Sequence, residues 1–313
     1  NHNGDIELAK KLIKVASEAG ADAIKFQTFK ADLLATKNAE KHAMLKNLEL
    51  KQADHDVLIR ICRDEGITFL STAFDLESLG FLKSLDVPLF KIPSGEITNL
   101  PLLRQIATYD RPVIMSTGMA TLEEAKSAVG SLVQAGLDMQ QLTLLHCTTE
   151  YPTPFANVNL RAMQTLAQEF PHAHVGYSDH TLGIEIPVAA VAMGATVIEK
   201  HFTLDRNLPG PDHAASLLPG ELKEMVIAIR NTEKALGNGV KEPSSVEIAT
   251  QKIARKNIVA SRPISKGEIF SEENLAVKRA GGGASPMLWD TIVGQAAGKD
   301  YLAEEPIHFP LST

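Results

Sequence analysis

Cysteine is scarce in this sequence. Its 313 residues include two, Cys62 and Cys147, and both lie in apolar runs far apart along the chain. Two isolated cysteines do not make the disulfide framework on which small secreted proteins depend. We therefore expect the protein to work in a reducing compartment, the cytoplasm.

An excess of positive charge is also missing. Lysine and arginine number 31 against 38 for aspartate and glutamate, so the formal net charge is −7 and the pI is about 5.8. Proteins that bind nucleic acid concentrate positive charge, and no basic stripe is visible here, so nucleic acid is not an expected partner. No apolar run approaches the ~20 residues of a membrane-spanning helix, so no membrane partner is expected either.

What the sequence has in abundance is one repeating unit, an apolar helical pattern followed by a short strand. The first helix is expected over residues 5–19, ends at Gly20 as at a C-terminal cap, and precedes a strand over 22–28. Thr121 and Glu124 form a capping box for a later helix. Six further strands are expected at 67–72, 89–95, 112–118, 142–147, 174–179 and 196–201. A last helix carries Leu222, Met225, Val226 and Ile229 on one face.

Strands that alternate with helices predict a parallel sheet, either doubly wound or closed into a barrel. A doubly wound sheet usually has a glycine-rich phosphate loop after its first strand, whereas here polar residues recur at the end of every strand. We therefore favour an α/β fold of the (β/α)8 TIM-barrel type. Such a barrel has eight strands and seven are expected in this sequence, so we expect the first strand to precede Asn1, with NHNG as its loop.

The barrel is expected to occupy residues 1–237. A charged insertion over 29–51 follows the first visible strand and is expected to form a lid or rim. A polar linker over 238–251 leads to a second domain over 252–313, whose roughly 60 residues are few for an independent core. Within it, a Lys266-Gly267 turn is expected between short strands.

Side chains two positions apart in a strand point to the same side of the sheet. Lys25 therefore shares a side with Gln27, Ser178 with His180, and Glu199 with His201. A lysine within an apolar strand is costly unless it meets an anion. Lys25 and Lys91, with hydroxyls on other strands, predict a pocket for phosphate and carboxylate groups. The hydroxyls are those of Thr72, Ser116 and Ser178.

The two histidines at consecutive strand ends predict a metal site. A lone histidine at a strand end is more often a hydrogen-bonded structural residue, and we expect that role for His146. For His180 and His201 together, each followed by a helix pattern or a polar loop, we favour metal binding once the barrel is granted. Glu199 lies between apolar residues on the same side and is either a catalytic carboxylate or a partner of a ligand histidine.

The remaining candidates also have structural interpretations. Lys25 alone is equally explained as a rim residue with its ammonium group in solvent. Ser116 and Ser178 precede helices and are also typical helix caps, although the same geometry lets helix N-termini bind phosphate. Tyr151 is also explained by loop packing alone.

Taken in order, the strand-end segments resemble those of the sialic acid synthases. The segments are NHNGD, IKFQTFKAD, FLSTAFD, KIPSGE, STGMAT, LLHCTTEYPTPF, GYSDHT, EKHFTLDRNLPGPDH and ISKGEIFSEENLAVKR. They cover essentially the whole chain. The resemblance implies a TIM barrel with a C-terminal antifreeze-like (SAF) domain. It also implies an enzyme that condenses phosphoenolpyruvate with N-acetylmannosamine to N-acetylneuraminate and phosphate, with cleavage of a C–O bond.

The same resemblance implies roles for individual residues. His180 and His201 would hold a divalent cation, most often Mn²⁺, with Mg²⁺ or Co²⁺ as alternatives. Glu199 is the candidate catalytic residue, because the chain does not include the strand that carries the family's own proton-transfer glutamate. Phosphoenolpyruvate would be held by Lys25, Thr72, Lys91, Ser116 and Ser178. The sugar would face Gln27, Glu96, Tyr151 and Asp212.

In the family, the SAF domain crosses to the barrel of a partner subunit. The resemblance therefore implies a domain-swapped homodimer in which Arg279 completes the partner's sugar site. The alternative is that Arg279 is a surface residue paired with a nearby acid.

Several functions stay open. The same chemistry on another sugar would produce legionaminic or pseudaminic acid, or use a 6-phosphorylated N-acetylmannosamine. An alternative from a different class is a noncatalytic sugar-binding protein, that is, a barrel that has lost its catalytic activity. The retained histidines, lysines and hydroxyls argue against this alternative. An aldolase without phosphate chemistry is a weaker alternative, because its substrates would not require two lysines that face an anion.

Overall fold

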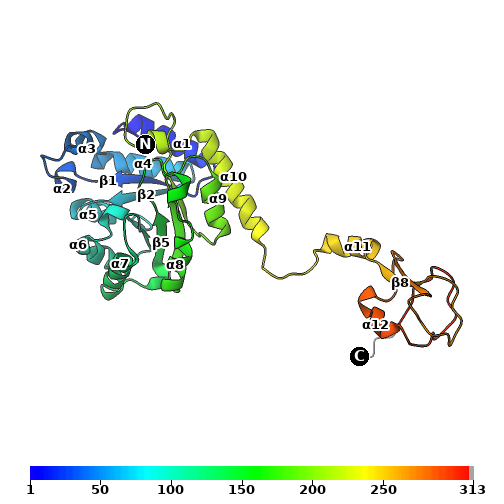
Figure 1. Cartoon of the computed structure of the whole chain (residues 1–313). Helices are drawn as coiled ribbons and strands as arrows, with labels where there is room; N and C mark the ends of the chain where they lie inside the picture. Colours follow the sequence, from blue (N-terminus) through cyan, green and yellow to red (C-terminus); the bar gives the residue numbers. More distant parts are fainter. Residues whose placement is uncertain (310–313) are drawn as a thin grey trace. The chain divides into compact units, whose positions relative to one another are not determined.

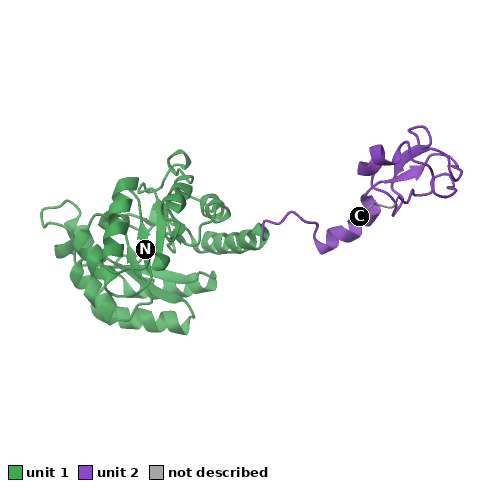
Figure 2. Ribbon diagram, turned by 90° about the horizontal axis from the view of Figure 1, so that it is seen from below, with its two compact units in different colours: residues 1–237 green, residues 238–313 purple. Residues whose placement is uncertain are grey.

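The computed structural model describes residues 1–309, which form two compact units (Figures 1 and 2). The first unit is Asn1–Gly237 and the second is Asn238–Thr313. Each unit has its own hydrophobic core. Among residues 1–309, no helix combines the length and the apolar character needed to cross a membrane.

The first unit is built on a parallel sheet of seven strands in sequence order, as the alternating pattern predicts. The strands are β1 (Ala23–Thr28), β2 (Thr68–Ala73), β3 (Phe90–Ile92), β4 (Val113–Ser116), β5 (Leu142–Cys147), β6 (His174–Asp179) and β7 (Ile198–Lys200). Every neighbouring pair is parallel. The order identifies a curled sheet of the TIM-barrel type, because each strand pairs with the next in the chain. The predicted fold class is confirmed.

Helices cover the outer side of this sheet (Figure 1). They are α1 (Ile6–Glu18), α4 (Gln52–Asp64), α5 (Leu76–Ser84), α6 (Leu100–Ala107), α7 (Leu122–Gln134), α8 (Ala162–Glu169), α9 (Glu185–Ala192) and α10 (Pro219–Leu236). In α1 the buried positions are Ala9, Leu12, Ile13 and Ala16, and the side chain of Asp5 caps the N-terminus. The capping box predicted for Thr121 and Glu124 is present at the start of α7. Amphipathic spacing and local caps thus place α1 and α7 where the sequence predicts them.

The insertion over 29–51 is not a plain loop. It contains the short helices α2 (Ala31–Leu34) and α3 (His42–Leu48). Met44, Leu45 and Leu48 line the main cavity of the first unit, so this segment forms one of the cavity's walls. This position agrees with the predicted rim.

Strands β1 and β7 are the two ends of the sheet, and within residues 1–309 no backbone pairing joins them. The main cavity, of about 610 Å³, extends into the space beside them. Its apolar wall there comes from α1 and α10, which contribute Leu12, Ala16, Leu222, Met225 and Val226. The strand that we expect ahead of Asn1 lies outside the sequence, so the structure does not test it.

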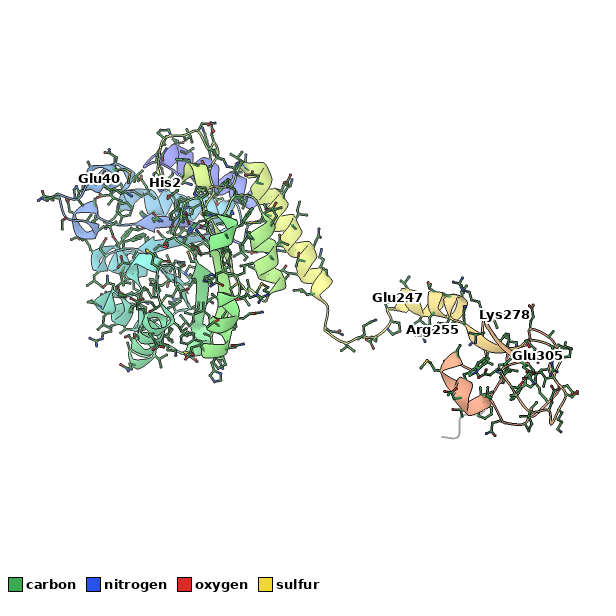
Figure 3. All side chains as sticks on the ribbon, viewed as in Figure 1. His2, Glu40, Glu247, Arg255, Lys278 and Glu305 are labelled. Atoms are coloured by element: carbon green, nitrogen blue, oxygen red, sulfur yellow. The ribbon has the colours of Figure 1, made fainter. Side chains whose placement is uncertain are left out.

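The second unit holds helix α11 (Ser245–Ala254), an antiparallel pair of strands and the short helix α12 (Trp289–Ile292). The strands are β8 (Asn257–Ala260) and β9 (Leu275–Lys278). Lys278 on β9 is exposed (Figure 3). Its ammonium group pairs with Glu304. The predicted turn at Lys266-Gly267 is present, since Gly267 has a φ of 86° and the Glu268 N–H donates to the Ser265 carbonyl.

The linker predicted over 238–251 differs from expectation because its second half is helical. Helix α11 begins inside it, where Ser244 and Glu247 form a capping box, and continues past residue 251. The sequence signal was present in the S-x-x-E spacing, but the polar composition of the stretch hid it.

Candidate functional site

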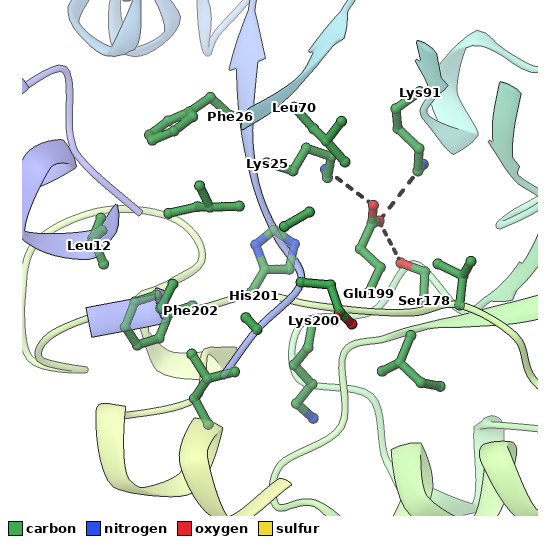
Figure 4. Close-up of a pocket in the computed structure, with 18 of the residues that line it drawn as sticks. Leu12, Lys25, Phe26, Leu70, Lys91, Ser178, Glu199, Lys200, His201 and Phe202 are labelled. Atoms are coloured by element: carbon green, nitrogen blue, oxygen red, sulfur yellow. Dashed lines mark hydrogen bonds and ion pairs between the residues drawn. The ribbon is translucent and has the colours of Figure 1, made fainter. Parts of the chain in front are cut away.

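The candidate residues of the barrel come from the ends of several strands and meet in the main cavity. Lys25 lies on β1, Lys91 on β3, and Ser178 and Glu199 on β6 and β7 (Figure 4). Gln27 lies on β1 and also lines the cavity. Side chains alternate along a strand, so these residues point into the curled sheet while their sequence neighbours point toward the helices. The alternation predicted from the sequence therefore brings residues far apart in the chain to one place.

Glu199 is the centre of this cluster. Its carboxylate oxygens lie 3.5 Å from Lys25 Nζ and 3.8 Å from Lys91 Nζ, and the hydroxyl of Ser178 donates to it at 2.9 Å (Figure 4). Burial alone would raise the pKa of Glu199, but the two lysines and the hydroxyl outweigh it and lower the pKa to about 2. Glu199 is therefore an anion at neutral pH and serves as the counterion of both lysines.

Lys91 is the more deeply buried of the two lysines, with 3% of its side chain exposed against 23% for Lys25. Its ammonium group donates to the hydroxyl of Ser116 at 2.7 Å and to the Ile92 carbonyl at 3.0 Å. Burial lowers the pKa of Lys91 to about 8, although the nearby Glu199 opposes this shift. Two lysines facing one carboxylate leave a net positive charge, as a pocket for an anion requires.

Thr72 on β2 lies beside Lys91, its backbone partner on β3. Its side chain is fully buried, and its hydroxyl has no hydrogen-bond partner among the described residues. A buried hydroxyl without a partner is costly in a folded protein. Its position in the ladder between Gln27 on β1 and Lys91 on β3 is consistent with a partner that arrives with a ligand.

His180 and His201 follow β6 and β7, and their ring centroids are 5.2 Å apart. The Nδ1 atom of His180 lies 2.6 Å from the Thr148 carbonyl, which only accepts, so Nδ1 donates and Nε2 keeps a free lone pair. Burial lowers the pKa of His180, and it lowers that of His201 to about 3. Both rings are therefore neutral near pH 7, which is the form that binds metals.

These two imidazoles could hold a divalent cation as its protein ligands. Among residues 1–309, no group of three or more histidine, cysteine, aspartate or glutamate side chains is arranged to hold one. A cation held by two histidines would take its remaining ligands from water or substrate oxygens. The ring of Tyr151 covers the pair, with centroids 4.1 Å from His180 and 5.7 Å from His201.

The residues predicted to face the sugar are less closely grouped. Gln27 and Asp212 line the main cavity, and burial raises the pKa of Asp212. Glu96 follows β3 in a short 3-10 helix and accepts a 2.6 Å hydrogen bond from the side chain of Asn99. Arg279 is exposed and lies directly after β9 in the second unit, so the first unit by itself does not contain it.

Two other histidines, His146 and His213, make hydrogen bonds that assign them structural roles. His146 Nε2 lies 2.8 Å from the Val158 carbonyl, a backbone group outside the candidate site, which confirms its structural role. His213, which the sequence did not single out, is buried between Thr203 and Asn3 at 2.7 Å and 2.9 Å. Its hydrogen bond to Asn3 connects the loop that carries Asp212 to the N-terminal segment of the sequence.

Sequence reasoning also missed a contact between the loops that follow β3 and β4. The Gly118 N–H donates to the hydroxyl of Ser94 at 3.0 Å. A Cβ atom at Gly118 would lie 2.7 Å from both Ser94 Oγ and Thr149 Cγ2, closer than side chains tolerate. Both residues stand in strand-end segments, which is the signal that could have identified them.

Comparison with known proteins matches residues 12–241 to the NeuB family and residues 255–310 to the SAF domain. This chain belongs to the NeuB family. The family resemblance inferred from the strand-end motifs is therefore confirmed, and so is the C-terminal SAF domain.

Relatives of this NeuB-family chain carry several related names. It is 51% identical to N,N'-diacetyllegionaminic acid synthase of Campylobacter jejuni, over 98% of this chain and 96% of that protein. It is 48% identical to the protein of the same name from Legionella pneumophila, over 94% of this chain and 87% of that protein. The N-acetylneuraminic acid synthetase of Leptospira borgpetersenii, crystallised with citrate, is 37% identical, with a TM-score of 0.75, covering 81% of this chain and 89% of that one.

Proposed function

We propose that this protein condenses phosphoenolpyruvate with an acetamido sugar to make N,N'-diacetyllegionaminic acid, with release of phosphate. The observation that carries the proposal is the placement of a cationic pocket and a pair of neutral histidines at neighbouring strand ends, with Glu199 and His201 lining one cavity. The reaction needs both parts, because one substrate is an anion and the other is an aldehyde.

The cationic pocket would hold phosphoenolpyruvate. Lys25 and Lys91 supply positive charge, and hydroxyl groups supply hydrogen bonds to phosphate oxygens. Those hydroxyls belong to Thr72, Ser116 and Ser178. Glu199 occupies the position between the lysines, so the substrate has to share these cations with it.

His180 and His201 would hold a divalent cation, for which we propose Mn²⁺, with Mg²⁺ or Co²⁺ as alternatives. When bound there, the cation supplies Lewis-acid polarisation of the sugar's aldehyde oxygen. The hydrogen bond from His180 Nδ1 to Thr148 orients the ring and keeps Nε2 available. Neutral rings at pH 7 mean that no proton has to leave before the cation binds.

The reaction itself joins C3 of phosphoenolpyruvate to the aldehyde carbon of the sugar. Water then adds at C2, and phosphate leaves by cleavage of its C–O bond. We assign proton transfer in these steps to Glu199. Its pKa of about 2 depends on the lysines, and once the phosphate shares their charge, the carboxylate becomes a better base.

The choice of sugar rests on the relatives at 51% and 48% identity, whose names specify a product with two acetyl groups on nitrogen. They favour this acceptor over N-acetylmannosamine, the acceptor we first expect from the sequence, which carries one such group. N-acetylneuraminate stays the second candidate product, since the Leptospira synthetase is 37% identical.

We also propose a domain-swapped homodimer, in which Arg279 of one subunit completes the sugar site of the other. The exposed side chain of Arg279 and the separate core of the second unit support this arrangement. Mixing the inactive variants Arg279→Ala and Lys91→Met tests it. A swapped heterodimer contains one intact site, so activity should return on mixing, and no recovery after subunit exchange would contradict the swap.

The function itself is tested by phosphate release from phosphoenolpyruvate. We expect release only with an acceptor sugar, with a higher kcat/KM for the diacetamido sugar than for N-acetylmannosamine. Release should stop after chelation and return with Mn²⁺. Equal use of both sugars would reject the specificity, and no release with either sugar would favour a noncatalytic sugar-binding protein.

A further inference from the structure

A buried ion pair lies directly behind the two histidines. Lys200 Nζ contacts Asp179 Oδ2, and their side chains are 1% and 0% exposed. The two residues are backbone partners in the ladder between β6 and β7. Each stands between two residues of the site. Asp179 lies between Ser178 and His180, and Lys200 lies between Glu199 and His201.

The pair points away from the cluster around Glu199. Because neighbouring side chains on a strand alternate, Asp179 and Lys200 face the helices when Ser178 and Glu199 face inward. Figure 4 shows the Lys200 side chain directed away from the carboxylate of Glu199. The pair therefore adds no side chain to the cationic pocket and acts on the site through the backbone of β6 and β7.

The same two residues hold the turn that follows His180. Asp179 accepts hydrogen bonds from the Thr181 N–H at 3.1 Å and from the Thr181 hydroxyl at 2.9 Å. Lys200 donates to the Thr181 carbonyl at 2.5 Å. The backbone on both sides of His180 is thus tied to the strand that leads into His201, which limits how far the two rings can separate or rotate.

Stability alone does not account for this pair. Removing two charges from water is costly, and packed apolar residues are often as stable as a buried ion pair or more so. Directional contacts, in contrast, define a single register between two strand ends. A pair that contributes geometry rather than net stability fits the place where two ligands from different strands have to meet.

We propose that Asp179 and Lys200 are positioning residues that set the separation and orientation of His180 and His201 for cation binding. The inference rests on the proposed function, because it concerns the cation assigned to those histidines. Residues that orient metal ligands without touching the metal typically change affinity or activity 10-fold to 100-fold when they are replaced.

The test is the double variant Asp179→Asn/Lys200→Met, which removes both charges together and leaves no unpaired buried charge. The amide oxygen that replaces the carboxylate would still accept from the Thr181 N–H, so the local turn is retained. We expect a melting temperature close to that of the original protein and a dissociation constant for Mn²⁺, measured by calorimetry, about 10-fold higher. The kcat should fall, while the KM for phosphoenolpyruvate should change little, because its pocket is untouched.

Asp86→Asn/Arg111→Gln is the matched control, since it removes an exposed ion pair at the opposite end of the strands. It should leave the affinity for Mn²⁺ unchanged. A folded Asp179→Asn/Lys200→Met variant that binds Mn²⁺ as tightly as the original protein would refute the positioning role. If that variant does not fold, the test uses Thr181→Val, which removes the hydroxyl contact with Asp179 without changing any charge. Unchanged affinity of Thr181→Val for Mn²⁺ would then refute the positioning role.

The original protein and His180→Ala separate this inference from the proposed function. If the two bind Mn²⁺ equally, the assignment of the cation to the histidines is wrong, and the positioning role is overturned with it. If His180→Ala loses Mn²⁺ and Asp179→Asn/Lys200→Met does not, the cation site stands and only the positioning role is wrong.

Discussion

Replacing Thr72 by valine should stabilise the barrel and weaken its binding of phosphoenolpyruvate. The two side chains have nearly the same shape, so the change replaces a hydroxyl by a methyl group and alters little else. In the structure, Thr72 is fully buried and its hydroxyl has no partner among the described residues. The free enzyme therefore carries the cost of an unsatisfied polar group, which is about 1–3 kcal/mol.

The expected magnitudes follow from this cost. For a unit of this size, about 1 kcal/mol moves the melting temperature by roughly 2–4 °C, so Thr72→Val should melt several degrees higher. A hydrogen bond to a charged group contributes about 1.5–3 kcal/mol, so the KM for phosphoenolpyruvate should rise about 10-fold to 100-fold. Thermal unfolding without ligand and initial rates of phosphate release measure the two effects.

Thr28→Val is the matched control on the neighbouring strand. The hydroxyl of Thr28 is buried but bonded, at 2.8 Å to His55 and at 2.7 Å to Ser71, on the helix-facing side of the sheet. Its loss should lower the melting temperature and leave the KM unchanged. A Thr72→Val enzyme that melts lower and keeps its KM would show that the Thr72 hydroxyl has a structural role, against the reasoning above.

Three features of the structure, at Lys91, Gly118 and Thr121, give four further predictions. Burial lowers the pKa of Lys91 to about 8, so the KM for phosphoenolpyruvate should increase when the pH is raised beyond 8. Lys91→Arg should not show this increase, because arginine keeps its charge throughout that pH range. In the same variant comparison, the increase in stability with pH between about 8 and 10.5 should be larger in the original protein than in Lys91→Arg, because unfolding lets Lys91 bind a proton that it loses in the folded state. Gly118→Ala should displace Ser94 and Thr149, cost about 1–3 kcal/mol of stability and lower kcat/KM; an unchanged kcat/KM would remove these loops from the site. Thr121→Ala should lower the free energy of unfolding by about 1 kcal/mol through loss of a helix cap, with no effect on activity, as chemical denaturation and rate measurements would show.

Much of the site was predictable because strand periodicity is local. Apolar runs and caps identified seven strands, and a period of two assigned Lys25, Ser178 and Glu199 to the inner side. The contact of Glu199 with both lysines was not predictable, because it joins β7 to β1 and β3 across the curled sheet. Which of several inward residues meet depends on the curvature of the sheet, and no local pattern encodes it.

The sequence by itself determined the fold class, the family and the residue types that reach the strand ends, because these follow from hydrophobic spacing and ordered motifs. Tertiary structure alone decided that Glu199 lies between both lysines as their shared counterion, that Thr72 has no partner among the described residues, and that Asp179 and Lys200 are joined behind the histidines. In the sequence, Asp179 and Lys200 are merely two charged residues beside better candidates. Their role appears when two strands 21 residues apart are paired in register, since that pairing brings the two charges together where both side chains are buried.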